Sequence, residues 1–342
     1  MELQILWFIL WGVLWAVYFM LDGFVVGMQM ISPVIAKTDT EKRILIHTVG
    51  PVWDGNEVWL ITAGGATFAA FPGTYALMFS YLYTALLLLL FALIIRGVSF
   101  EFRGKVDNHF WKGAWDKAIP ISGFLIALLF GVAFGNIFRG LPMDGTGYHG
   151  TFFSLLNPYG LLTGVFFLTL FAMHGALYVS VKTKGELCAR AEKWANVLWI
   201  AVLLLAVAFL LYSKIGTKLL DNYFNVPALL IIPFVAVASL VAIKIFMARN
   251  SWYKAFAASC VTVLFIVFTG VAGLFPNLIP SSMDYAWSLT IYNTSSSQYT
   301  LKIMTVVALI FVPIVICYKI WVYRIFRARV TEDDVLTDTD AY

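Results

Sequence analysis

The chain has 342 residues, of which 61% are apolar and only 12% charged, and its mean hydropathy is +0.86. This composition excludes a soluble globular protein and predicts an integral membrane protein. The net charge of +4 is spread over short loops, so we expect anionic lipid and no nucleic acid as its partner.

Nine apolar segments are long enough, at about 20 residues, to cross a hydrocarbon core about 30 Å thick. The first is long and the second short. We therefore predict an all-α fold with nine transmembrane helices, in a single membrane domain over residues 1–330. Residues 331–342 hold five acids and no base and are expected to form a solvated cytoplasmic tail. In chain order the segments are Ile5 to Ile31, Glu57 to Phe71, Thr74 to Arg96, Ala118 to Phe138, Tyr159 to Val181, Ala191 to Tyr212, Val226 to Met247, Tyr253 to Phe275 and Leu301 to Ile325.

The basic residues predict the orientation, because Lys and Arg near helix ends accumulate on the cytoplasmic side. With nine spans and an external N-terminus, the inside loops and tail carry 3, 5, 4, 3 and 4 basic residues. The outside segments carry 0, 0, 1, 2 and 1. A missed or extra span would scramble this asymmetry, so we expect the N-terminus outside and the C-terminus in the cytoplasm.

The first segment carries its large amphipathic side chains on one face when residues are placed about 100° apart. A Trp near a helix end is often a lipid-facing interfacial anchor, and Trp7 alone fits that description. The whole stripe does not, because Asp22 shares the face and a carboxylate is strongly disfavoured in lipid. We expect this face to meet a separate subunit. Its members are Gln4, Trp7, Trp11, Trp15, Tyr18, Asp22 and Gln29.

Glycines occupy a different arc of the same helix. Gly23 and Gly27 form a small-xxx-small pair, which lets another helix backbone approach closely. The first helix is therefore expected to have two protein-facing sides.

The stretch GPVWDGNEVW, at the entrance to the second segment, places Asp54 and Glu57 one helical turn apart. One interpretation is a capping box, with Asp54 as N-cap and Glu57 reaching back to the backbone. The other is a proton-loading site at the cytoplasmic face, where two close carboxylates favour uptake of a proton. Asp22 on the neighbouring helix would carry the proton deeper, since rows of acids build proton relays.

The second and third segments form a tight hairpin around Pro72 and Gly73. Counting equal distances from that turn brings Arg96 to the level of Gly50, with Glu101 just beyond. The sequence therefore predicts that an arginine and the acids converge.

Histidine and cysteine give little evidence for a cofactor in this chain. Haem between helices usually needs two strong axial ligands at membrane depth, and the chain offers one such histidine, His174. We expect His174 to be an interior residue with satisfied hydrogen bonds; haem ligation by it is the alternative. Cys188, Cys260 and Cys317 have neither metal-ligand nor disulfide spacing, so no metal site is predicted.

The stretch GPVWDGNEVWLITAGGATFAAFPGTYA resembles the signature of subunit II of cytochrome bd-type quinol oxidases. Further matches follow in order along nearly the whole chain. They are Asp22-Gly23-Phe24, GVAFGNIFRGLP from Gly131, LLNPYGLLTGV from Leu155, LFPNLIPSSM from Leu274 and SLTIYNTSSSQYTLKIMT from Ser288.

The resemblance implies two four-helix bundles plus one peripheral helix, in the plasma membrane of a prokaryote. It implies a heterodimer in which subunit I holds the haems, of b and d type, and the quinol site. Subunit II is then haem-free, stabilises subunit I and offers a cytoplasmic proton path while quinol is oxidised and oxygen is reduced to water. Whether a small single-helix third subunit is present stays open.

Residue by residue, the resemblance assigns proton-path roles to Asp54 and Glu101, with Trp53, Asn56 and Trp59 around them. Two departures bear on the path. Val25 stands where many relatives have a second acid in the first helix, and Glu57 stands where some have Gln. Glu57 is therefore expected to support Asp54. The competing hypothesis is a proton-coupled secondary transporter, which would also bury acids but usually shows inverted repeats.

Overall fold

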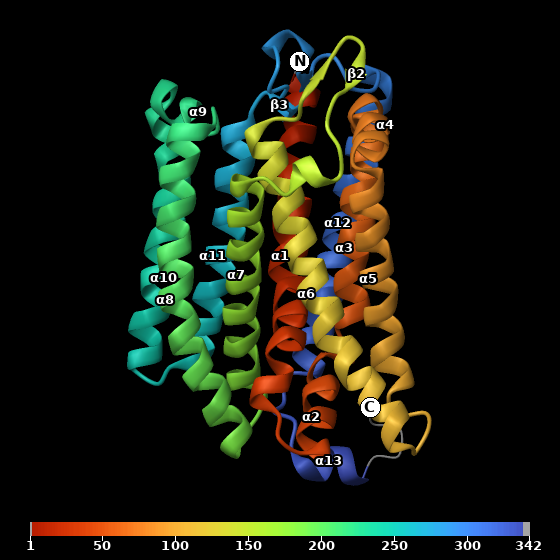
Figure 1. Ribbon diagram of the computed structural model, residues 1–342, viewed down its shortest axis with the longest axis vertical. Coiled ribbons are helices and arrows are strands. Elements are labelled where there is room, and N and C mark those ends of the chain that lie inside the picture. The colour runs from red at the N-terminus through yellow and green to blue at the C-terminus, as the bar shows by residue number, and fades with distance from the viewer. Residues whose placement is uncertain (1, 338–342) are drawn as a thin grey trace.

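The computed structural model describes residues 2–337, and these residues form a long bundle of helices (Figure 1). The long helices are connected by short helices, turns and two small β-hairpins. The longer helices are α1 (Glu2–Ile35), α2 (Asp39–Val49), α3 (Trp53–Ala70), α4 (Pro72–Tyr81), α5 (Tyr83–Phe102), α6 (His109–Arg139), α7 (Pro158–Lys182), α8 (Gly185–Gly216), α10 (Ile231–Ala248), α11 (Trp252–Leu274) and α12 (Gln298–Ile325).

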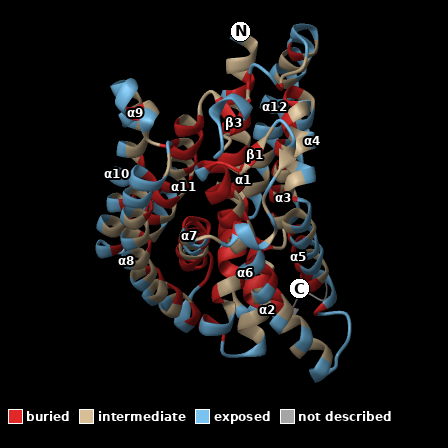
Figure 2. Ribbon diagram, turned by 45° about the horizontal axis from the view of Figure 1, so that its top comes forward, coloured by how far each residue is buried: buried red, intermediate tan, exposed pale blue. Residues whose placement is uncertain are grey.

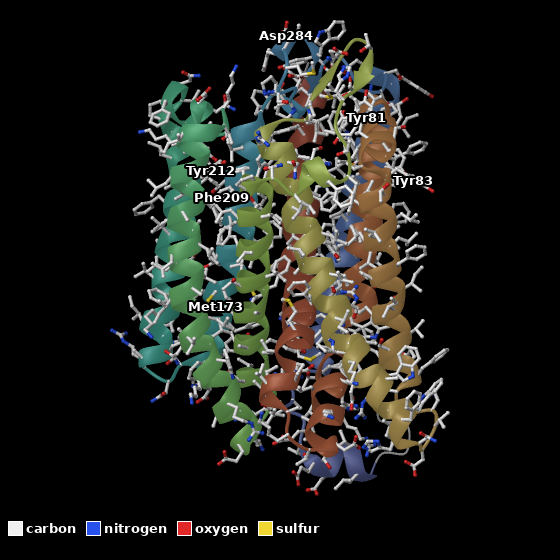
Figure 3. All side chains as sticks on the ribbon, viewed as in Figure 1. Tyr81, Tyr83, Met173, Phe209, Tyr212 and Asp284 are labelled. Carbon is white, nitrogen blue, oxygen red and sulfur yellow. The ribbon has the colours of Figure 1, made fainter. Side chains whose placement is uncertain are left out.

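Eight helices of the described chain are long and apolar enough to cross a membrane. They coincide with eight of the nine predicted segments, and the all-helical membrane class is confirmed. The remaining predicted segment, Glu57 to Phe71, lies in α3, which is helical over 18 residues and is not among the eight. The count of nine, the grouping into bundles and the orientation stay predictions. The third predicted segment is divided, because α4 ends at Tyr81 and α5 begins at Tyr83 (Figure 3).

Helix α1 lies at the centre of the molecule and packs against α3, α6, α7 and α11. Figure 2 shows buried residues concentrated on α1, α6 and α7, whereas α8 and α10 are largely exposed. Aromatic rings fill part of this core: Phe209 and Tyr212 of α8, labelled in Figure 3, both pack against the ring of Tyr159 on α7. The exposed faces of these helices are apolar, as expected for a protein surrounded by lipid.

The predicted close approach at the glycines of α1 is confirmed. A Cβ on Gly27 would overlap the backbone carbonyl of Phe171, and one on Gly175 would overlap the backbone at Gly27. A Cβ on Gly23 would lie 2.9 Å from the ring of Phe171. Helices α1 and α7 therefore touch backbone to backbone, which only residues without a side chain permit.

One end of the bundle carries the N-terminus and the two β-hairpins (Figure 1). Strand β1 (Met143–Asp144) pairs with β2 (Gly147–Tyr148), and β3 (Asn277–Ile279) pairs with β4 (Leu289–Thr290). We call this the hairpin end.

The opposite end carries α2 and α13 (Glu332–Thr337), and we call it the basic end. Here cationic side chains tie helices together. Arg103 bonds Asp116 of α6 and Asp39 of α2, both at 2.6 Å. Arg190 of α8 bonds the carbonyl of Ile35 at 2.6 Å, which satisfies the C-terminus of α1.

The expected solvated tail over residues 331–342 is partly wrong. Residues 332–337 form α13, which packs against α2 with Val335 fully buried. The chain reaches α13 past Lys182 of α7, which donates to the carbonyls of Phe326 and Ala328 after α12. An apolar residue within the acidic stretch is the physical reason for docking, since it buries against α2. Residues 338–342 lie outside the described part of the chain.

Candidate functional site

The centre of the site is Arg96 of α5, whose side chain is fully buried. Its Nη1 lies 2.6 Å from Oδ2 of Asp22 on α1, and its Nη2 lies 2.6 Å from Oε2 of Glu57 on α3. Three helices thus contribute one charge each. A buried guanidinium is stable only when carboxylates and hydrogen bonds compensate it, and its planar fork suits two acceptors at once.

Burial increases stepwise through this charge triad. The Glu57 side chain is 22% exposed, whereas those of Asp22 and Arg96 are 1% and 0% exposed. Asp22 lies 13 residues before the end of α1, which is about 20 Å along the helix axis. The triad therefore leads from the edge of the protein to its interior.

Some polar atoms of the triad have no hydrogen-bond partner among the described residues. They are Oδ1 of Asp22 and Nε of Arg96. The hydroxyl of Tyr18, one turn from Asp22 on α1, is buried close to the Asp22 carboxylate. All three atoms are buried. Buried polar atoms are normally satisfied by protein or by ordered water. This cluster is therefore suited to holding water or a mobile proton.

Counted alone, the triad contains one guanidinium and two carboxylates. Lys319 of α12 also interacts electrostatically with Asp22, so a second cation borders the triad. The acids and the cations together form one polar network among the helices.

The capping-box interpretation of Asp54 and Glu57 is wrong. Helix α3 begins at Trp53, its N-cap is Val52, and no side chain caps it. Asp54 is exposed in the first turn, and Glu57 turns toward Arg96 and away from the backbone. The buried cation outcompetes the backbone because a charge-assisted bond is stronger than a cap. A true capping box occurs at Thr38 and Glu41 of α2.

Asn56, which separates the two acids, is fully buried and joins three helices. Its Nδ2 donates to the carbonyl of Leu21 on α1 at 2.8 Å. Its Oδ1 accepts from the hydroxyl of Tyr323 at 2.9 Å and from Nζ of Lys319 at 3.4 Å, both on α12. Asn56 therefore links α12 to Leu21 of α1, the residue that precedes Asp22.

Sequence reasoning missed the contribution of α12. Lys319 interacts electrostatically with Asp54 and Asp22, and its Nζ occupies the space that a Cβ on Gly55 would take. A lysine inside the apolar segment Leu301 to Ile325 was the available signal, because charged residues within a span usually have a partner.

The other residues predicted around the acids lie outside the triad. Trp53 packs its ring against Phe100, and a Cβ on Gly97 would touch it. Trp59 is buried and lines a cavity beside α12. Glu101 is exposed in the last turn of α5 and does not belong to the triad.

The prediction that the tryptophan face of α1 meets a separate subunit is corrected. Trp7, Trp11, Trp15 and Tyr18 are each less than 9% exposed within this chain alone. Trp7 bonds α12, Trp11 donates to Thr67 of α3, and the other two rings pack on α6. The stripe required a protein neighbour, and the chain's own helices provide it.

His174 of α7 is fully buried, and both of its ring nitrogens are engaged. Nε2 lies 2.9 Å from the carbonyl of Met20, and Nδ1 lies 2.7 Å from Oγ of Ser259. It is an interior histidine with satisfied hydrogen bonds. Within residues 2–337, no three His, Cys, Asp or Glu side chains gather closely enough to hold a metal ion.

Comparison with known proteins places these features in a family. The model of cytochrome bd terminal oxidase subunit II matches residues 3–326. Cytochrome bd-I ubiquinol oxidase subunit 2 of Escherichia coli K12 is 37% identical, over 98% of this chain and 97% of that protein. Cytochrome bd ubiquinol oxidase subunit 2 of Bacillus subtilis is 36% identical, over 98% and 99%. A probable cytochrome oxidase subunit 2 of Haemophilus influenzae is 38% identical, over 94% and 93%.

The fold is also found among solved structures. One chain of the bd oxidase from Geobacillus thermodenitrificans superposes with a TM-score of 0.76 at 18% identity. The match covers 95% of this chain and 99% of that one. At this identity the likeness concerns the fold.

Proposed function

The chain belongs to the cytochrome bd terminal oxidase subunit II family, and from this membership we propose that it stabilises a haem-bearing subunit I and conducts protons toward it. It is a multi-pass protein of a prokaryotic plasma membrane and a subunit of a quinol-oxidising respiratory oxidase. In the proposal this chain carries no haem, and the quinol reacts on the partner. All the relatives described above are oxidase subunits, so the transporter hypothesis gains no support.

The basic end is the cytoplasmic end in this proposal. Arg103, Lys182 and Arg190 gather there and tie helix ends together, as the accumulation of basic residues on the inside leads one to expect. Helix α3 is about 27 Å long at 1.5 Å per residue and packs along α1, which favours a crossing as the ninth span.

Protons enter at Asp54, which is exposed at the start of α3. They pass one turn deeper to Glu57 and from there to Asp22 across the guanidinium of Arg96. Oδ1 of Asp22 and the buried hydroxyl of Tyr18 beside it continue the line into the core. The observation that carries this proposal is a line of three carboxylates with increasing burial, from the exposed Asp54 through the partly exposed Glu57 to the buried Asp22.

The surface for subunit I is proposed to include the outer face of α12. No residue in the apolar window of α12 is buried within this chain, whereas each of the other candidate spans buries at least 17% of its window. Cys317 is exposed on this helix and gives a natural attachment point. A crosslinker on Cys317 that captures subunit I in the intact oxidase supports this surface; capture only from the opposite face, at cysteines introduced on α8, contradicts it.

The proton path is tested by replacing Asp22 with Asn and Glu57 with Gln in the intact oxidase. Both variants keep the shape and hydrogen bonding but hold no exchangeable carboxyl proton. Quinol-driven oxygen consumption is expected to fall by about tenfold at saturating quinol with haem content unchanged. Glu186→Gln is the matched control, because Glu186 is 88% exposed on α8. Unchanged turnover in both triad variants removes the relay and leaves the stabilising role.

A further inference from the structure

A polar pocket opens at the hairpin end, where three of the long helices finish. It has a volume of about 510 Å³ and is lined by the last residues of α6, α8 and α11 and by the segment around β3. All three helices are candidate membrane spans, so the pocket lies at the level where lipid headgroups meet the hydrocarbon core. The charge triad lies among α1, α3 and α5, so this pocket is separate from the proton path.

Two basic side chains line the pocket. They are Arg139, the last residue of α6, and Lys218, just after α8, and both are exposed. Neither takes part in any ion pair recorded for residues 2–337. The helix ends are capped without them, because the amide of Gly140 caps α6 and the amide and hydroxyl of Thr217 cap α8. Two such cations in one pocket favour a ligand that carries a phosphate.

The pocket also contains a buried hydrogen-bond acceptor. Asn277 of β3 lines it and is only 8% exposed, yet its Oδ1 has no hydrogen-bond partner among the described residues. A buried amide oxygen is normally satisfied, so it calls for a donor. The carboxylate of Asp284, labelled in Figure 3, lines the same pocket. Together with the partial negative charge of three helix C-termini, these acceptors suit an ammonium group.

An exposed apolar stripe leads from the pocket along α8. Ile215 lines the pocket and is exposed, and Leu211, Val207 and Leu204 follow it at helical spacing, all exposed. The stripe is about 16 Å long from Ile215 to Leu204. An acyl chain would cover this stripe, whereas a soluble zwitterion would leave it bare.

We propose that this pocket binds the headgroup of a phosphatidylethanolamine molecule. The phosphate lies against Arg139 and Lys218. The ammonium group donates to Oδ1 of Asn277 and pairs with Asp284, and one acyl chain follows the α8 stripe. Phosphatidylcholine has no N–H to donate to Asn277, and phosphatidylglycerol has no cation for Asp284.

The test uses the intact oxidase in detergent and a phosphatidylethanolamine whose acyl chain carries a photoreactive diazirine. After irradiation, mass spectrometry of the peptides is expected to find the label in the α8 stripe. Unlabelled phosphatidylethanolamine should displace it about tenfold more effectively than phosphatidylcholine or phosphatidylglycerol, the effect of one hydrogen bond to a buried acceptor. Glycerophosphoethanolamine, the headgroup without acyl chains, should not displace it. Label only outside the stripe, equal displacement by the three lipids, or displacement by the soluble headgroup at the same concentration overturns the proposal.

One variant tests the buried acceptor. Asn277→Leu keeps the size of the side chain and removes its oxygen, so the preference for phosphatidylethanolamine over phosphatidylcholine is expected to disappear while the label stays on α8. No described group loses a partner of this oxygen in the variant, so the fold is expected to persist. Asn225→Leu is the matched control, because Asn225 is exposed at the same end and does not line the pocket. A preference that survives Asn277→Leu contradicts the proposal.

A second set of variants tests the phosphate contacts. Arg139→Gln with Lys218→Gln is expected to weaken labelling about thirtyfold, the attraction due to two basic side chains. Lys214→Gln with Lys302→Gln removes the same charge from exposed positions at the hairpin end outside the pocket, and should leave labelling unchanged. Equal labelling of the two double variants would show that Arg139 and Lys218 do not hold a phosphate.

Discussion

Nη1 of Arg96 and Oδ2 of Asp22 lie 2.6 Å apart, and neither side chain is reached by solvent. The two residues are separated by 74 positions in the chain, so this ion pair links α5 to α1, although α5 packs mainly on α6. It is the deepest polar contact of the triad.

Removing the cation is expected to destabilise the chain more than removing the pair. Arg96→Leu leaves the Asp22 carboxylate buried without compensation, which costs about 3–5 kcal/mol. Arg96→Leu with Asp22→Leu removes both charges and is expected to regain most of that loss. The measurement is the thermal unfolding midpoint of the purified oxidase, together with its haem content. A single variant as stable as the wild type contradicts the triad geometry.

The backbone contact between α1 and α7 makes a second prediction. Gly27→Ala places a methyl group on the carbonyl of Phe171 and is expected to destabilise the fold by about 1–3 kcal/mol. Gly113→Ala is the control, because Gly113 is also helical but has nothing within 4 Å. It is expected to be neutral or stabilising by up to about 1 kcal/mol. Unfolding midpoints in the same detergent compare the two, and equal shifts would refute the close approach.

The hydrogen bond between Asn56 and Tyr323 of α12 gives a third prediction. Tyr323→Phe removes one hydrogen bond, with an expected cost of about 1 kcal/mol. Hydrogen exchange in the last turns of α12 should accelerate in the variant while exchange in α7 stays the same. Tyr318→Phe is the control, since Tyr318 is exposed on the same helix. Identical exchange in both variants would show that Asn56 does not hold α12.

Acid is expected to weaken the basic end through Glu41. Burial alone raises the pKa of Glu41, but hydrogen bonds from the Lys37 amide, Arg190 and the Thr38 amide outweigh it and leave this pKa below its usual value. A carboxyl whose pKa is lower in the folded state stabilises fully above its unfolded pKa, and loses this contribution as pH falls through the folded one. The stabilisation is therefore present at pH 7 and is lost progressively below about pH 4.5.

Glu41→Gln should thus lower the unfolding midpoint at pH 7 and reduce its dependence on pH in the acid range. Glu186→Gln provides the control, because that carboxylate reaches Arg190 only at 4.0 Å from an exposed position. A Glu41→Gln variant with the pH dependence of the wild type would count against the contribution.

The length of the apolar segments predicted the long helices well, because lipid leaves few alternatives to a helix of about 20 residues. The convergence of Arg96 with the acids was also predictable, since the turn at Pro72 fixes the level of both arms. The sequence did not show which helices these side chains contact. A wheel shows that Trp11 and Asp22 need protein neighbours, but it cannot tell the chain's own α3 and α5 from another subunit.

The contacts of α12 could not be predicted from the sequence for a related reason. Asn56 and Tyr323 are 267 positions apart, and no local pattern links residues at that separation. The choice between a cap and a relay at Glu57 likewise depended on whether Arg96 came within 2.6 Å, which only the packed structure decides.

Asn56 gives the molecule a mechanical link between its periphery and its interior. Its side-chain oxygen accepts a hydrogen bond from Tyr323 of α12, and its side-chain nitrogen donates to the carbonyl of Leu21, next to Asp22. If subunit I packs on α12 as proposed, a tilt of α12 is expected to shift the carbonyl of Leu21 and with it the Asp22 carboxylate. We therefore expect the surroundings of the Asp22 carboxylate to differ between the assembled oxidase and the isolated chain.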